Sequence, residues 1–257
     1  MEWLVALLLL GLLVYLILDT MSSSDSDSSD DERESSKRLC DYYAQGSVYE
    51  DIPDALTRGI RLVELHVYAD EQDEPVVAKQ PLQGGYDYAV DNYAFEKACI
   101  DIVNGAFPSK YPLVLSIVPH STKVTTLNRV AYHLKHTLHK HFVEDKDIQR
   151  MPMDKLANKL VIVSGGNISG TELDELVNLN WDGSGLRRLE YGQAVFPRDQ
   201  GELVAYNRNA ITMVAPDAAF AKLTVNPSTT RMYGCQWNLF PNPSAPAGFV
   251  EKPSGLQ

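Results

Sequence analysis

The chain has 257 residues, of which 44% are hydrophobic, and carries a formal net charge of −11. This length and composition allow one large domain, and the acidic balance argues against the concentrated basic face of a nucleic-acid-binding protein. The three cysteines, Cys40, Cys99 and Cys235, are far apart and odd in number, which argues against a disulfide framework.

The chain opens on a hydrophobic segment. Residues 3–18 contain no charge, and at 1.5 Å per helical residue they approach the lower limit for crossing a core of about 30 Å. The segment has neither the basic start nor the small-residue end of a cleaved signal peptide. We therefore expect residues 1–18 to be a single-pass transmembrane signal-anchor. The nearest basic residues follow this segment, which favours a cytoplasmic location for the rest of the chain.

An acidic tract comes next. Residues 19–34 hold seven acidic residues and one arginine, with almost no hydrophobic ones. Such a segment cannot bury enough apolar surface to offset the entropy of ordering it. We therefore expect residues 19–34 to be a disordered stalk, and residues 35–257 to be the folded domain.

Strand and helix patterns alternate through the folded part. The expected order is helix 48–59, strand 60–68, helix 93–107, strand 111–119, helix 126–142 and strand 159–166. Shorter segments of both kinds follow over residues 187–240. Repeated strand–helix units with continuously hydrophobic strands predict a parallel sheet covered by helices.

Two polar residues interrupt the hydrophobic strand "IRLVELHVY". Glu64 and His66 alternate along it and therefore face the same side. A carboxylate beside an imidazole in such a strand indicates a catalytic or metal site, or the remnant of one. A second histidine group, "HLKHTLHKH", has no evident carboxylate or cysteine ligand, so we interpret it as a solvated helix face rather than a zinc site.

Several segments resemble those of phosphoinositide-specific phospholipase C, in the same order. "ALTRGIRLVELHVY" resembles the family's "AL-x-x-G-x-R-x-VELD-x-W", and "AFPSKYPLVLSIVPHST" resembles its "AF-x-x-S-x-YP-x-ILSLENHCS". "MYGCQWNLF" is similar to its "WNAGCQMVALNF". The resemblance implies an α/β fold, a distorted TIM (β/α)8 barrel, with an X-like half at 35–166 and a Y-like half at 185–257. It also implies an ancestral chemistry, the calcium-dependent cleavage of a phosphoinositide headgroup through a cyclic phosphodiester.

Most residues that this chemistry needs are replaced. The positions equivalent to the two catalytic histidines and four calcium ligands are, in that order, Lys37, Lys79, Arg38, Glu64, His66 and Val118. Only Glu64 keeps the family residue. Calcium takes six to eight oxygen ligands, so we expect the ancestral calcium site to be lost, with no metal or cofactor in its place. Two lysines of the family's headgroup pocket align with Val163 and Gly165.

Three interpretations of the mouth of the barrel, where TIM-barrel sites lie, stay open: it has become functionally silent, it binds an anion, or it carries a new catalytic site. An anion site there would be made of Lys37, Arg38, Glu64, His66 and Lys79. We predict a membrane-anchored pseudoenzyme that binds an anionic lipid or a protein partner at a membrane. Two alternatives stay open. One is a divergent phosphoric diester hydrolase acting on phosphatidylinositol lipids; the other is a structural membrane protein of an enveloped virus, held in a host membrane or the virion.

Overall fold

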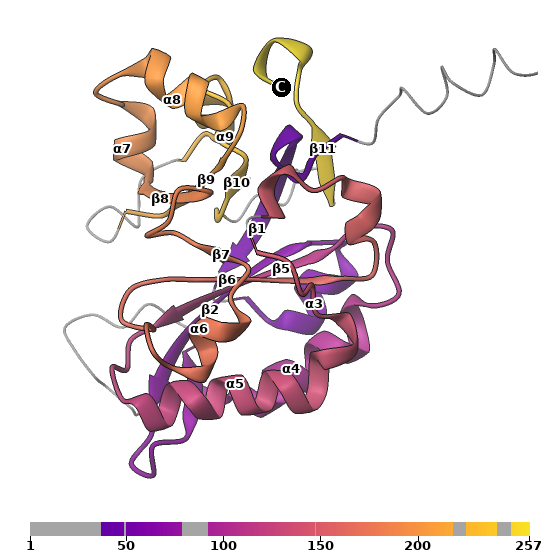
Figure 1. Ribbon diagram of the computed structural model, residues 1–257, viewed down its shortest axis with the longest axis vertical. Helices are drawn as coiled ribbons and strands as arrows, with labels where there is room; N and C mark the ends of the chain where they lie inside the picture. The colour runs from indigo at the N-terminus through magenta and orange to yellow at the C-terminus, as the bar shows by residue number, and fades with distance from the viewer. Residues whose placement is uncertain (1–36, 49, 79–91, 147, 218–224, 241–247) are drawn as a thin grey trace, which may run out of the picture. The chain divides into compact units, whose positions relative to one another are not determined.

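The computed structural model (Figure 1) describes residues 37–48, 50–78, 92–146, 148–217, 225–240 and 248–257. The expected anchor at 1–18, the expected stalk at 19–34 and Lys79 lie outside these ranges. Among the residues within them, no helix is long and hydrophobic enough to cross a membrane.

Eight parallel strands form the wall of a barrel in the described part of the chain. They are ordered β7-β6-β5-β2-β1-β10-β9-β8, and each neighbouring pair is parallel. Their bounds are β1 Tyr42–Val48, β2 Leu62–Ala69, β5 Leu113–Pro119, β6 Leu160–Ser164, β7 Leu179–Asn180, β8 Leu186–Glu190, β9 Ile211–Ala215 and β10 Trp237–Asn238. No ladder between described residues joins β7 to β8, so the barrel is nearly closed, with one gap.

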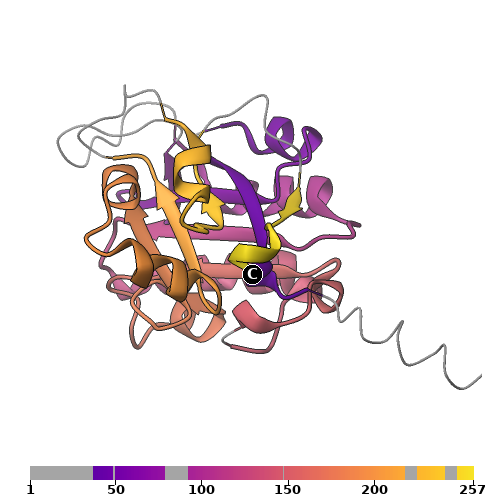
Figure 2. The same cartoon turned by 90° about the horizontal axis from the view of Figure 1, so that it is seen from above.

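Three short strands and a set of helices complete the domain. The strands β3 Pro75–Ala78, β4 Asn92–Ala94 and β11 Phe249–Glu251 pair antiparallel with their neighbours. The helices are α3 Ile52–Thr57, α4 Phe95–Ala106, α5 Val124–Leu138, α6 Glu172–Leu176, α7 Tyr191–Val195, α8 Gln200–Asn207 and α9 Pro227–Arg231. The 3-10 turns are η1 Leu39–Asp41, η2 His139–His141, η3 Ile148–Arg150, η4 Met153–Leu156 and η5 Ser254–Leu256. Figure 2 shows the same barrel from above, with the yellow C-terminal segment beside indigo β1.

The helix α3 illustrates how local sequence sets these elements. Asp51 is its N-cap and accepts a hydrogen bond from the Asp54 amide, while Pro53 occupies the first turn, where a missing N–H costs nothing. Gly59 follows the helix with a φ of 81°, a conformation that glycine adopts without steric cost. The chain therefore turns directly into β2.

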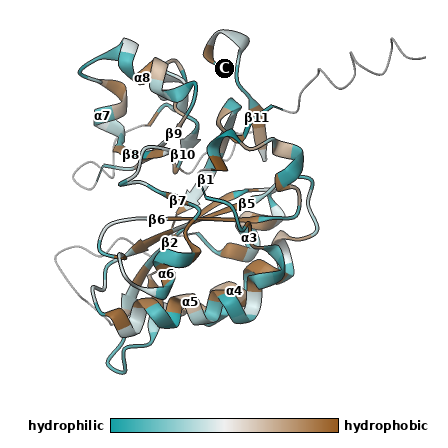
Figure 3. Ribbon diagram, in the orientation of Figure 1, coloured by the Kyte–Doolittle hydropathy of each residue, from teal (hydrophilic) through white to brown (hydrophobic). Residues whose placement is uncertain are grey.

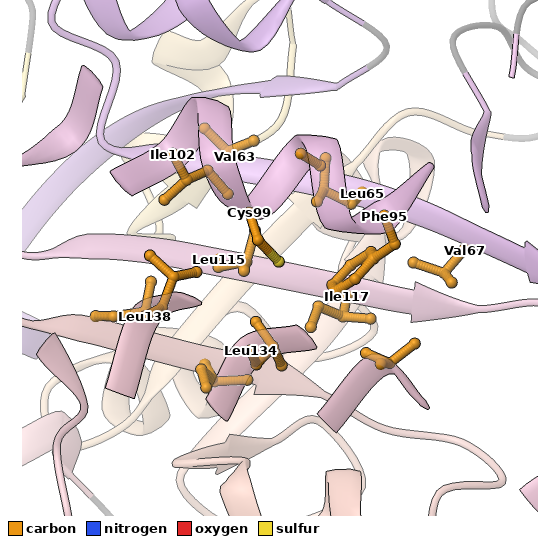
Figure 4. Close-up of a cluster of buried hydrophobic side chains, with 14 of the residues drawn as sticks. Val63, Leu65, Val67, Phe95, Cys99, Ile102, Leu115, Ile117, Leu134 and Leu138 are labelled. Carbon is orange, nitrogen blue, oxygen red and sulfur yellow. The ribbon is translucent and has the colours of Figure 1, made fainter. Parts of the chain in front are cut away.

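Alternation along the strands separates two hydrophobic cores. Val63, Leu65, Leu115 and Ile117 face outward and pack against α4 and α5 (Figure 4). The opposite faces fill the barrel interior, where the buried residues include Leu62, Val114, Val161, Leu186 and Met213. The central strands are accordingly brown in Figure 3, while α4 and α5 also carry teal, hydrophilic positions.

The predicted parallel barrel covered by helices is therefore confirmed. The amphipathic helix expected at 93–107 is α4, and the strand expected at 111–119 is β5. The helix expected at 126–142 starts slightly earlier and ends at Leu138, after which the chain tightens into η2.

Candidate functional site

The interior of the barrel contains one buried carboxylate, Glu64, that binds several partners. Glu64 on β2 is 2% exposed. Arg188 binds it through both amino groups, with Nη1 2.5 Å from Oε2 and Nη2 2.9 Å from Oε1. Ser116 donates its hydroxyl to Oε2 at 2.9 Å, and His66 Nε2 lies 3.2 Å from Oε1. The carboxylate thus takes part in four hydrogen bonds.

These partners keep Glu64 ionised. Burial alone would raise the pKa of the Glu64 carboxyl, because a charge is poorly solvated inside a protein. The charge of Arg188 and the hydrogen bonds from His66 and Arg188 outweigh burial and lower that pKa to about 2. Glu64 is therefore negative at any ordinary pH, and Arg188 is its counter-ion.

Arg188 reaches Glu64 from the far wall of the barrel. It lies on β8, and β2 is four strands away from β8 in either direction around the wall. The guanidinium also lies 5.4 Å from the centre of the Trp181 ring, within the range of a cation–π contact. A Cβ added to Gly165 would sit 2.4 Å from Trp181 Nε1, so the glycine at the end of β6 makes room for the indole.

A second group of rings extends from Glu64. Nδ1 of His66 lies 2.8 Å from Nε2 of His120, and the two rings stack at 5.0 Å. The His120 ring also stacks on Tyr68 at 4.2 Å. Burial, assisted by His66, lowers the pKa of His120 to about 4, so His120 is neutral at pH 7. Because a carboxylate only accepts, His66 donates through Nε2 to Glu64.

Two of the residues predicted for an anion site lie elsewhere. Lys37 forms an ion pair with Glu251, and Arg38 binds Asp41 at 2.8 Å and donates to the Arg208 carbonyl oxygen. Both precede β1, whereas the mouth of a parallel barrel lies at the carboxyl ends of its strands. The structure therefore does not bring Lys37 or Arg38 together with Glu64. This placement does not fit the predicted equivalence of Lys37 and Arg38 to a catalytic histidine and a calcium ligand, because both residues precede β1.

The remaining predicted positions fall as follows. His66 and Glu64 do share the interior face of β2, as their spacing predicts, and Val118 is the β5 partner of His66. Val163 is buried inside the barrel. Lys79 lies outside the described residues. Val48, at the carboxyl end of β1, stands beside Glu64 in the strand register.

Sequence reasoning missed Ser116 and Arg188. The motif "LRRLE" carried a usable signal, because Leu186 and Arg188 alternate and Leu186 is hydrophobic, which puts Arg188 on the interior face with it. Nothing local shows that its partner lies 124 residues earlier in the chain.

The arrangement around Glu64 does not fit calcium. Arg188 binds both carboxylate oxygens, His66 offers a nitrogen, and Val118 offers no ligand atom. Calcium requires several oxygen ligands around one point. Across the described ranges no group of three or more acidic, histidine or cysteine side chains is placed to hold a metal ion.

Comparison with known proteins identifies the family to which this barrel is similar. Residues 39–164 match the model of the phosphatidylinositol-specific phospholipase C, X domain. The match runs from η1 to the end of β6, so it contains Glu64 and His66 but neither Lys37 nor Arg38. No curated protein matches the sequence.

Solved structures share the fold at low sequence identity. PLC21 of S. officinalis has a TM-score of 0.68 at 15% identity and covers 86% of this chain and 38% of its own. PLC21 of L. pealei has a TM-score of 0.64 at 16% identity, covering 79% and 34%. A calcium-dependent phosphoinositol-specific phospholipase C from Pseudomonas sp. has a TM-score of 0.53 at 11% identity, covering 80% and 90%. The chain therefore spans little more than a third of the two PLC21 proteins.

Proposed function

We propose that this chain, a member of the phosphoinositide-specific phospholipase C-like family, is a pseudoenzyme that binds a partner at a membrane instead of cleaving lipids. The observation that carries the proposal is the environment of Glu64. This is the one residue kept from the family's calcium ligands, and Arg188 binds both of its oxygens. A metal could use this carboxylate only by displacing a partly buried guanidinium.

The histidines at the mouth also favour a structural role. Cleavage of a phosphodiester by this route needs one group to take a proton from the attacking hydroxyl and another to give one to the leaving group. Three of the four ring nitrogens of His66 and His120 are engaged with each other or with Glu64. Both ring nitrogens of His66 are thereby occupied, so His66 is not presented as a base toward a substrate.

The partner is more consistent with a protein than with an anionic headgroup. Lys37 and Arg38 lie at the amino end of β1, and the charge of Arg188 at the mouth is neutralised by Glu64. Among the described residues, which do not include Lys79, the mouth thus shows no cluster of the cations that phosphate recognition uses. Flotation of the 257-residue protein with phosphatidylinositol phosphate vesicles, compared with a variant lacking residues 1–18, tests this: we expect binding to depend on the hydrophobic segment and not on the headgroup.

Membrane attachment itself rests on the sequence of residues 3–18. We propose a single-pass anchor with the barrel on the cytoplasmic side. In cells, the protein should resist carbonate extraction, and protease added to sealed vesicles of known orientation should reach the barrel from the cytoplasmic side only. Recovery of the protein in the carbonate supernatant would contradict the anchor.

Turnover assays test the loss of activity directly. Phosphatidylinositol and its phosphates are incubated with the protein, with and without calcium, beside an active phospholipase C as positive control. We expect no cleavage in either condition and no calcium binding in the micromolar range by calorimetry. Turnover that is abolished in Glu64→Gln would instead establish the divergent phosphodiesterase.

A further inference from the structure

The gap between β7 and β8 leaves one side of β8 without a strand partner among the described residues. Backbone hydrogen bonds join every other pair of neighbouring strands in the barrel wall, and within the described part of the chain only β9 pairs with β8 in this way. We propose that the ion pair between Arg188 and Glu64 is an internal clamp that fastens β8 to the opposite wall of the barrel.

The ion pair connects opposite sides of the barrel wall. Arg188 and Glu64 come from strands that stand four positions apart in both directions around the wall. Their contact is bidentate, which fixes direction as well as distance. Ser116 on β5 holds the carboxylate from the side, at 2.9 Å. The clamp therefore connects β2 and β5, in the X-like half, to β8, the first strand of the Y-like half.

Trp181 completes the clamp at the gap itself. It opens the short connection from β7 to β8, and its backbone amide donates to the Ser164 carbonyl oxygen at 3.2 Å. Its indole packs against Gly165 and against the guanidinium of Arg188. One side chain thus touches β6 on one side of the gap and β8 on the other.

The neighbouring residue, Arg187, provides a matched control. It lies on the same strand but points outward, where it pairs with Glu202 at 2.8 Å and covers the Tyr206 ring at 3.8 Å. Glu202 is 54% exposed, and surface ion pairs contribute little to stability. Removing one member of a buried pair, in contrast, leaves an unpaired buried charge.

The test compares the melting temperatures of wild type, Arg188→Met, Glu64→Gln, their double variant and Arg187→Met. We expect Arg188→Met to lower Tm by about 6–20 °C and Arg187→Met to lower it far less. The double variant should melt above Arg188→Met, because the unpaired charge is gone. If Arg188→Met does not fold, Arg188→Lys takes its place, because it keeps the charge without the bidentate contact. We expect Arg188→Lys to fold and to have a Tm below those of wild type and Arg187→Met.

Hydrogen exchange distinguishes a clamp from a merely stabilising pair. In Arg188→Met or Arg188→Lys, amides of residues 181–190 should exchange at least tenfold faster than in wild type, while those of β5 change much less. Equal acceleration in both places, equal Tm losses in the Arg188 and Arg187 variants, or a double variant that shows the simple sum of both single losses would overturn the proposal. None of these readouts involves lipid cleavage, so the result is independent of whether the protein is a pseudoenzyme.

Discussion

The depressed pKa of Glu64 predicts a specific loss of stability in acid. The pKa falls from an ordinary value of 4.5 to about 2 in the folded protein. A pKa difference of about 2.5 corresponds to about 3 kcal/mol of folding free energy, since each pH unit is worth 1.36 kcal/mol. The folded state holds its proton more weakly than the unfolded state. This stability is therefore fully present above pH 4.5 and is lost as the pH falls toward 2.

The measurement is the free energy of unfolding by urea at several pH values between 7 and 2, for wild type and Glu64→Gln. Other carboxylates titrate in both proteins, so the difference between the two curves isolates Glu64. We expect wild type to lose about 3 kcal/mol more than the variant over this range. Parallel curves would show that the carboxylate is not held by Arg188 as described, and the reasoning about the site would fail with it.

Three further predictions concern other parts of the barrel. Gly165→Ala should cost about 1–3 kcal/mol and shift Trp181 fluorescence, because the new methyl overlaps the indole, whereas Gly255→Ala, which meets no atom within 4 Å, should change neither. Burial lowers the pKa of Lys252 to about 8, so between pH 8 and 10.5 the unfolded state binds more protons and stability should rise with pH in wild type relative to Lys252→Met. Burial raises the pKa of all three cysteine thiols to about 11 or 12, so a thiol reagent at pH 8 should modify them only after urea unfolds the protein.

The fold was readable from the first half of the sequence because its strands are long and continuously hydrophobic. Five consecutive residues of β6 and the first five of β5 are buried, which is typical of parallel strands covered on both faces. The second half of the sequence gave a weaker strand signal, because β7 and β10 span two residues each, which is too short for a periodic pattern to appear. Tertiary pairing rather than local pattern defines these strands.

At the candidate site, only the contact between residues close in the sequence could be predicted. The two-residue spacing of Glu64 and His66 predicts their shared face, and the structure places their side chains 3.2 Å apart. The motif match for Lys37 and Arg38 carried no information about which end of the strand they occupy, and the structure places both before β1. Arg188 could be assigned an inward face but not a partner, because that contact depends on closure of the whole barrel.

Glu64 depends on Arg188 to remain ionised inside the barrel. An ionised carboxylate that is 2% exposed would carry a desolvation cost of several kcal/mol if its cation were simply lost. It would then bind a proton, and its pKa would rise instead of falling. Arg188, on the same chain, supplies the positive charge that outweighs burial and lowers this pKa. The guanidinium of Arg188 thus contacts both oxygens of the carboxylate through which a metal ion would have to bind.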